Sequence, residues 1–261
     1  MREKRYDVIF WDVDGTLLDF AKSERWALTE TFREYGMEID EEIISLYSSI
    51  NDSFWKRLEL GQITREQVFH GRFKELFAQF LPGGALVREH IDAARLQEID
   101  VAEFHLKFRH HLGSVYFYLD DSIALCKKLK EEGFLQYVIT NGAEWPQRNK
   151  LHLSGFDAVM DDIFISEVIG YNKPDLRFFE ACFEKIKAVR GEEEAIWNRE
   201  RILVVGDSMT SDMKGAQNAG LDSCHYAPKL EGNLKQNGVT WQIAHLWDLE
   251  GILWQNQKVR K

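Results

Sequence analysis

Two aspartates separated by a single residue, Asp12 and Asp14, follow the apolar run Tyr6–Trp11 and precede Gly15. Alternate side chains of an extended strand point to the same side, so both carboxylates can face one crevice at the carboxyl end of a strand. Placing two acids at the end of a buried strand is costly unless a metal ion or a reaction uses them. Such carboxylates can act as nucleophiles, general acids and bases, or metal ligands. The alternative is that they cap a turn by accepting backbone N–H groups.

A second pair of acids follows another apolar run. Asp207 comes directly after Ile202–Gly206, and Asp212 stands five residues further on, near an expected helix start. Carboxylate oxygens on separate loops, with room for water, are the kind of ligand set that suits Mg²⁺. The alternative is that both residues are simple helix N-caps.

Two further segments offer groups that could hold an anion. Thr140 and Asn141 close the apolar run 135–140, and such donors, with the amides beyond them, can form an anion cradle. Lys173 precedes Pro174, which predicts extended backbone just before a helix, where a fixed cation would offset phosphate charge. The alternatives are an ordinary strand-end turn and a solvated surface lysine.

The elements that must position these residues are strands that alternate with helices. Near-continuous apolar runs rich in β-branched and aromatic residues indicate strands that are buried on both faces of a parallel sheet. We expect strands at Tyr6–Trp11, Leu135–Thr140, Ile163–Ser166 and Ile202–Gly206, with helices at Asp121–Glu132, Asp175–Val189 and Ser211–Ala219. This alternation predicts the α/β class, with a doubly wound, Rossmann-like parallel sheet. Ligands of such sheets bind beyond the carboxyl ends of the strands.

Between Gly15 and Ser114 the sequence contains no strand-like run. We expect helices there at Lys22–Tyr35, Glu41–Leu60, Thr64–Phe80 and Val101–Leu112. Because structureless connections longer than about 15 residues are uncommon in compact domains, this segment is predicted to be a separate unit. The predicted organisation is an inserted helical cap of residues 18–113 and an α/β core formed by residues 1–17 and 114–261. We assign no role to the stretch Leu81–Glu98.

Composition narrows the class of protein. The chain of 261 residues has 43 acidic and 33 basic residues and a net charge of −10, which disfavours nucleic acid and anionic membrane surfaces as partners. Its three cysteines are far apart, so neither a disulfide framework nor a zinc ribbon is expected. No window has the length of a membrane span, and the first apolar run is interrupted by acids. We therefore expect a cytoplasmic protein, a monomer or weak dimer.

The order of the four motifs is more specific than any one of them. Strand–DxDGT, strand–TNG, Lys-Pro-Asp and strand–GDSxxxD follow one another along the chain. In this order the chain resembles the haloacid dehalogenase-like hydrolase superfamily over residues 5–17 and 115–225. The resemblance implies a Mg²⁺-dependent phosphomonoester hydrolase that acts through an aspartyl-phosphate. It implies a helical cap between the first and second motifs.

The resemblance also implies a role for each motif residue. Asp12 would be the nucleophile, and Asp14 would be the general acid for the leaving oxygen and then the base for water. The expected magnesium ligands are the Asp12 carboxylate, the Asp14 backbone carbonyl, Asp207 and Asp212, the last directly or through water. The expected phosphate-binding residues are Thr140, Asn141 and Lys173.

Within the superfamily, the segment 51–73 and the segment Phe164–Gly170 are similar to those of pyrimidine-type 5′-nucleotidases. The substrate implied by this resemblance is a small phosphorylated metabolite, a pyrimidine nucleoside monophosphate. Trp55 and Arg72 are the candidate substrate contacts in the cap. One departure is Tyr116–Asp120, which stands where relatives have a Leu-x-Pro-Gly turn.

Other functions remain open at this level. They are a phosphatase for phosphoglycolate or sugar phosphates, a sugar-phosphate mutase, a 2-haloacid dehalogenase, and a scaffold that has lost activity. A dehalogenase needs no metal and lacks the second acid of the first motif, so Asp14 and Asp207 argue against it. Retention of Asp12, Asp14, Lys173 and Asp207 argues against a scaffold.

Overall fold

The computed structural model describes residues 3–81, 84, 91, 93–191, 198–228 and 237–255. The chain divides into two compact units. The α/β unit comprises residues 1–19 and 118–261, and the helical unit comprises residues 20–117. The sequence prediction placed these boundaries at residues 17 and 114, a few residues earlier.

Within the described residues, the α/β unit contains a sheet of six parallel strands in the order β3-β2-β1-β4-β5-β6. The strands are β1 (Val8–Trp11), β2 (Leu135–Thr140), β3 (Asp162–Ile165), β4 (Ile202–Gly206), β5 (Asp222–Tyr226) and β6 (Trp241–Ile243). The predicted α/β class with a doubly wound parallel sheet is confirmed. The sequence prediction contained the first four strands and missed β5 and β6.

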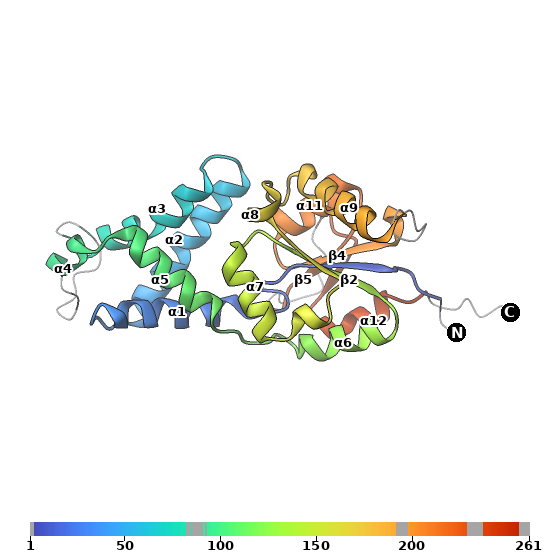
Figure 1. The fold of residues 1–261 in the computed structure, drawn as a ribbon, viewed down its shortest axis with the longest axis horizontal. Coiled ribbons are helices and arrows are strands. Elements are labelled where there is room, and N and C mark those ends of the chain that lie inside the picture. The colour runs from blue at the N-terminus through green and yellow to red at the C-terminus, as the bar shows by residue number, and fades with distance from the viewer. Residues whose placement is uncertain are drawn as a thin grey trace. The chain divides into compact units, whose positions relative to one another are not determined.

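Helices cover both faces of this sheet. Figure 1 shows α9 (Leu176–Arg190) and α11 (Lys214–Ala219) on one face, and α6 (Ser122–Glu131) and α12 (Leu249–Ile252) on the other. Successive side chains of β1 point to opposite faces of the sheet. On the face covered by α9, Val8 and Phe10 pack into the apolar cluster that contains Phe179. On the opposite face Trp11 is fully buried, and its indole N–H donates to Gln136 Oε1 at 3.1 Å.

Short elements complete the α/β unit. They are α7 (Glu144–Leu153), α8 (Ser166–Ile169), a π-helical turn η3 (Met209–Met213), and the 3₁₀ turns η1 (Phe156–Ala158), η2 (Arg199–Arg201) and η4 (Leu246–Asp248). The helix predicted at Ser211–Ala219 is therefore divided into η3 and α11. Helix α7, which follows β2 directly, was not predicted.

The helical unit is built from α1 (Phe20–Glu34), α2 (Glu41–Glu59), α3 (Arg65–Ala78), α4 (Ala93–Glu98) and α5 (Val101–Gly113). Thr64 forms a capping box with Gln67, and Asp100 accepts N–H groups at the start of α5. The core is aromatic, and the Phe104 ring lies 5.1 Å from Phe32 and 5.0 Å from Phe73 between centroids. Much of the stretch Leu81–Glu98 lies outside the described residues.

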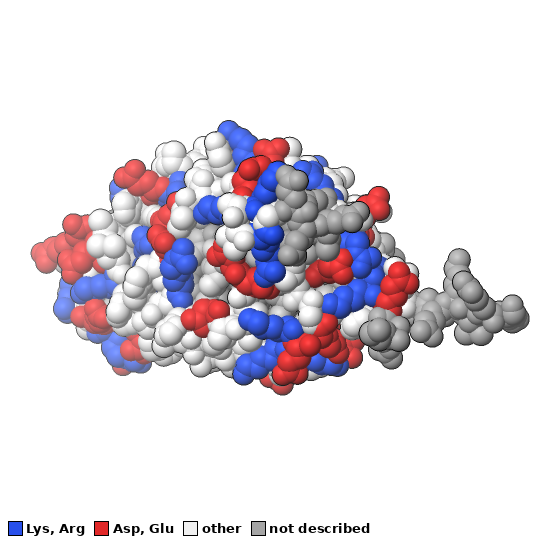
Figure 2. Space-filling model, turned by 45° about the vertical axis from the view of Figure 1, so that its right-hand side comes forward, with Lys and Arg blue, Asp and Glu red and all other residues white. Residues whose placement is uncertain are grey.

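The surface charge is mixed in sign on the face that Figure 2 shows, where acidic and basic side chains alternate over short distances. Among the helices of the described residues, none is both long and apolar enough to cross a membrane.

Candidate active site

The carboxylates of the first and fourth motifs meet at the carboxyl edge of the sheet. β1 and β4 are adjacent and in register, and the Asp12 N–H donates to Val205 O at 2.9 Å. Carboxylate oxygens of Asp12, Asp207 and Asp212 lie within 4.8 Å of one another. Asp12 and Asp212 are buried, whereas Asp207 is exposed. The predicted cluster of three acids is therefore present in the structure.

Two glycines leave the space that these acids occupy. Gly15 has a φ of +91°, and a Cβ on this residue would overlap with the Asp207 carboxylate. A Cβ on Gly206 would overlap with the Asp212 carboxylate. The chain can therefore pass close to each carboxylate only because both positions lack a side chain.

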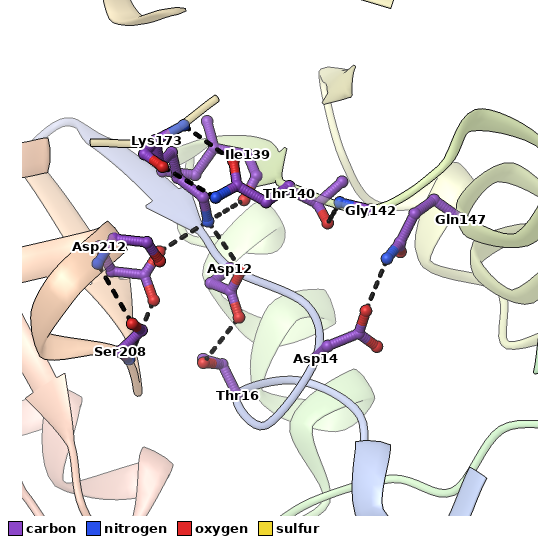
Figure 3. Close-up of polar contacts among 12 residues, drawn as sticks. Asp12, Asp14, Thr16, Ile139, Thr140, Gly142, Gln147, Lys173, Ser208 and Asp212 are labelled. Carbon is purple, nitrogen blue, oxygen red and sulfur yellow. Dashed lines mark hydrogen bonds and ion pairs between the residues drawn. The ribbon is translucent and has the colours of Figure 1, made fainter. Parts of the chain in front are cut away.

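Lys173 is the cation at the centre of this cluster. Its ammonium donates to Asp12 Oδ1 at 2.8 Å, to Asp212 Oδ1 at 2.6 Å and to Ile139 O at 2.8 Å (Figure 3). An ammonium has three N–H donors, so these bonds use all of them. The residue is 1% exposed, which excludes the alternative of a solvated surface lysine.

The residues of the second motif hold the Lys173 segment in place. The Asn141 side chain donates to Lys173 O at 2.9 Å and accepts the Lys173 N–H at 2.8 Å. Thr140 is buried, and its hydroxyl oxygen accepts the Gly142 N–H at 3.1 Å. Because Asn141 directly follows β2, this exchange of hydrogen bonds fixes Lys173 relative to the sheet.

Asp14 has different partners, which the sequence analysis missed. Its Oδ2 accepts a hydrogen bond from Gln147 Nε2 at 2.6 Å, and its Oδ1 forms an ion pair with the Lys150 ammonium. Both partners lie one turn apart on α7 and are buried. Nothing in a single sequence distinguishes a buried lysine on an unpredicted helix from a surface lysine, so no signal was available.

The site carries an excess of negative charge. Among the six charged side chains described above, four are carboxylates and two are ammonium groups, which leaves −2 when all are ionised. Burial, together with the negative charges of Asp212 and Asp14, raises the pKa of Asp12 to about 7, although Lys173 opposes the shift. Burial alone would lower the pKa of Lys173, but the adjacent Asp12 and Asp212 carboxylates outweigh it and raise this pKa.

Asp207 is also affected by its neighbours. Its residue surface is exposed, but the protein packed around the carboxyl limits its hydration and, with the charges of Asp12 and Asp212, raises its pKa to about 8. The candidate donors are oxygen atoms alone, and the site as a whole has a residual charge of −2 when all six groups are ionised. These residues therefore fit a divalent cation of the hard type, such as Mg²⁺.

The two candidate residues of the helical unit differ in exposure. Trp55 on α2 is partly buried against the core of that unit. Arg72 on α3 is only 3% exposed, donates to Asn51 Oδ1 and lies over the rings of Phe73 and Phe108. The structure thus places Arg72 in the interior of the helical unit, where it bonds another side chain of that unit.

Comparison with known proteins defines the class. Residues 6–220 match the haloacid dehalogenase-like hydrolase family. The chain is 32% identical over 250 residues to the HAD-hydrolase YfnB of Bacillus subtilis, with 96% of each chain covered. The crystal structure of YfnB bound to magnesium superposes with a TM-score of 0.80 and covers 96% of this chain and 99% of that one. The chain belongs to the haloacid dehalogenase-like hydrolases.

Two further relatives define the subgroup. The chain is 31% identical over 251 residues to the pyrimidine 5′-nucleotidase PynA of Streptococcus pneumoniae, with 96% of each chain covered. It is 28% identical over 253 residues to the pyrimidine 5′-nucleotidase YjjG of Escherichia coli, which covers 95% of this chain and 98% of that one. The predicted superfamily, subgroup and enzyme class are confirmed, and the protein is a hydrolase of the phosphatase type.

Magnesium is expected to stabilise the folded protein, and more so at higher pH. Without a cation the folded state retains protons on Asp12 and Asp207 up to about pH 7–8, whereas the unfolded carboxyls ionise near pH 4. The folded state then binds more protons than the unfolded state in this window, so stability falls as pH rises. Magnesium binding needs the ionised carboxylates and should reverse this loss.

The measurement is thermal unfolding with and without Mg²⁺ at about pH 5.5 and about pH 8. At a hundredfold excess over Kd we expect about 3 kcal/mol of stabilisation at the higher pH, or about 5–10 °C in Tm. Asp207→Asn should reduce the increase, and KCl at equal ionic strength is the control. Equal increases at both pH values, or no increase, would contradict the assignment.

Proposed function

We propose that the protein is a Mg²⁺-dependent phosphatase that hydrolyses pyrimidine nucleoside 5′-monophosphates through an aspartyl-phosphate on Asp12. The observation that carries the proposal is the position of Asp12, which lies at the end of β1 and 2.8 Å from the buried Lys173 ammonium. Asp14 lies two residues further along the chain and bonds a different pair of side chains, Gln147 and Lys150. The similarity of this chain, over 96% of its length, to a protein named as a pyrimidine 5′-nucleotidase supports the choice of substrate.

In this proposal Asp12 attacks the phosphorus atom and Asp14 donates a proton to the oxygen that leaves. Asp14 then takes a proton from the water that hydrolyses the acyl phosphate. Lys173 keeps the Asp12 carboxylate oriented through the bond to Oδ1. Thr16, whose hydroxyl donates to Asp12 Oδ2 at 3.2 Å, fixes the other oxygen.

The loop at Thr140 and Asn141 is proposed to bind the phosphoryl oxygens. Because the Asn141 side chain exchanges hydrogen bonds with Lys173, phosphate binding at this position is assigned to the main chain and not to the side chain. Lys173 would reach a phosphoryl oxygen by exchanging one of its three acceptors for it.

The residues that would hold Mg²⁺ are Asp12, Asp207, Asp212 and the Asp14 backbone carbonyl. Bound magnesium supplies the positive charge that allows an anionic carboxylate to approach a phosphate dianion.

The main test is phosphate release from a panel of pyrimidine and purine nucleoside monophosphates, phosphoglycolate and sugar phosphates, with Mg²⁺ or with a chelator. We expect pyrimidine nucleotides to be hydrolysed fastest and no ester to be hydrolysed in chelator. The Asp12→Asn variant should release no phosphate, and its Tm should stay close to that of the unaltered protein. Preference for phosphoglycolate or a sugar phosphate would leave a general phosphatase. Halide release from a 2-haloacid in chelator would favour the dehalogenase alternative.

Asp14→Asn should discriminate between leaving groups. A nucleoside leaves as a basic alkoxide that needs a proton, whereas an activated aryl phosphate releases a stable phenolate. We therefore expect kcat to fall about 10²- to 10⁴-fold for nucleotides and much less for p-nitrophenyl phosphate. Equal losses on both substrates would contradict the assignment of Asp14 as general acid.

Trp55 is proposed to contact the pyrimidine base, since its ring is only partly buried against the helical unit. Stacking on an aromatic ring contributes about 1–3 kcal/mol per base, so Trp55→Ala should raise KM for nucleotides about 5- to 150-fold. Hydrolysis of p-nitrophenyl phosphate should be unchanged. Leu106→Ala, which removes a well-exposed apolar side chain of the same unit, is the control. An equal effect on both substrates would show that Trp55 only supports the core of the helical unit.

A further inference from the structure

Asp14 is the acid whose orientation the proposed reaction depends on, and both of its oxygens are engaged. Figure 3 shows the Asp14 side chain turned towards Gln147, away from Lys173 and Asp212. Gln147 Nε2 donates to Oδ2 at 2.6 Å, and the Lys150 ammonium pairs with Oδ1. An aspartate side chain can adopt three staggered χ1 rotamers, and two donors fixed on one helix select one of them.

The two donors are not ordinary surface residues. Lys150 is 1% exposed and Gln147 is 2% exposed, whereas the Asp14 side chain keeps 25% of its surface open to solvent. A buried ammonium is costly unless it is paired, so Lys150 stabilises the fold only when Asp14 stays where it is. The ion pair therefore ties a buried group on α7 to an acid that remains accessible.

Gly142 belongs to the same arrangement. A Cβ at this position would overlap with the Gln147 side chain amide. The glycine that follows the Thr140–Asn141 loop thus provides the space through which Gln147 reaches Asp14.

We propose that Gln147 and Lys150 are positioning residues that hold the Asp14 carboxyl in the orientation needed for proton transfer. The inference rests on the proposed function, since it assumes that Asp14 acts as general acid and base. A catalytic carboxyl must lie within about 2.6–3.2 Å of the oxygen that it protonates, and misplacement by about 1 Å can lower the rate about 10²-fold. Neither residue needs to contact the substrate.

The test is a double-mutant cycle between Lys150→Met and Asp14→Asn. For a nucleoside monophosphate, Lys150→Met alone should lower kcat about 10- to 100-fold and leave KM within about threefold. Turnover of p-nitrophenyl phosphate should fall much less. In the Asp14→Asn background, Lys150→Met should change kcat by less than about twofold, because the group that Lys150 positions no longer transfers a proton.

Thermal unfolding shows whether Lys150→Met folds. If it does not, Gln147→Leu or Gly142→Ala takes its place in the double-mutant cycle with Asp14→Asn. Arg148→Met is the matched control, because Arg148 is exposed on the same helix and pairs with Glu144. Its activity should equal that of the unaltered protein.

The positioning role would be overturned if the decreases in kcat of the two single variants multiplied in the double variant. It would also be overturned if Lys150→Met lowered kcat equally for the nucleotide and the aryl phosphate. These results are distinguishable from failure of the proposed function, in which the unaltered protein would release no phosphate from any ester of the panel.

Discussion

Three carboxylates converge where β1 and β4 end, and a single buried ammonium, that of Lys173, bonds two of them. Two like unit charges about 4 Å apart repel by about 4 kcal/mol at an effective dielectric constant near 20, so the cluster persists only if cations or bound protons offset the repulsion. Much of the local structure serves this requirement. Asn141 anchors the Lys173 backbone to the end of β2, and Gly206 lets Asp212 approach closely.

This arrangement also resolves a conflict between net charge and substrate. A chain with a net charge of −10 repels anions at long range, and the face in Figure 2 shows both signs intermixed. In the proposed function, the positive charge that an anionic substrate requires comes from the Lys173 ammonium and from a divalent cation, which offsets the remaining negative charge of the site. Interactions between buried charges are screened by salt much less than those between exposed charges. The charge interactions within such a site therefore depend little on the charges of the protein surface.

The sequence predicted the acidic cluster because it requires only strand ends. Apolar runs locate β1 and β4 and place Asp12 and Asp207 at their carboxyl ends, and the family resemblance implied that both bind one metal ion; the structure pairs the two strands, which brings the acids together. β5 was missed because its residues, DSCHY, do not form an apolar run, and β6 has only three residues. Helix α7 was missed because it is polar and contains Pro146 within its first turn. Burial of Lys150 depends on that helix, so its pairing with Asp14 could not be inferred.

The two acids of the first motif therefore have separate counter-ions, although they lie one residue apart. Asp12 pairs with Lys173, which precedes α9, while Asp14 pairs with Lys150 on α7. The negative charge of Asp14 already contributes to the raised pKa of Asp12, and a shared ammonium would couple the two acids more strongly. Separate partners let the two carboxylates take different roles, but each partner must then be fixed independently to the end of the sheet. Asn141 does this for Lys173, and Gly142 admits Gln147 to Asp14, so two neighbouring residues after β2 support both halves of the site.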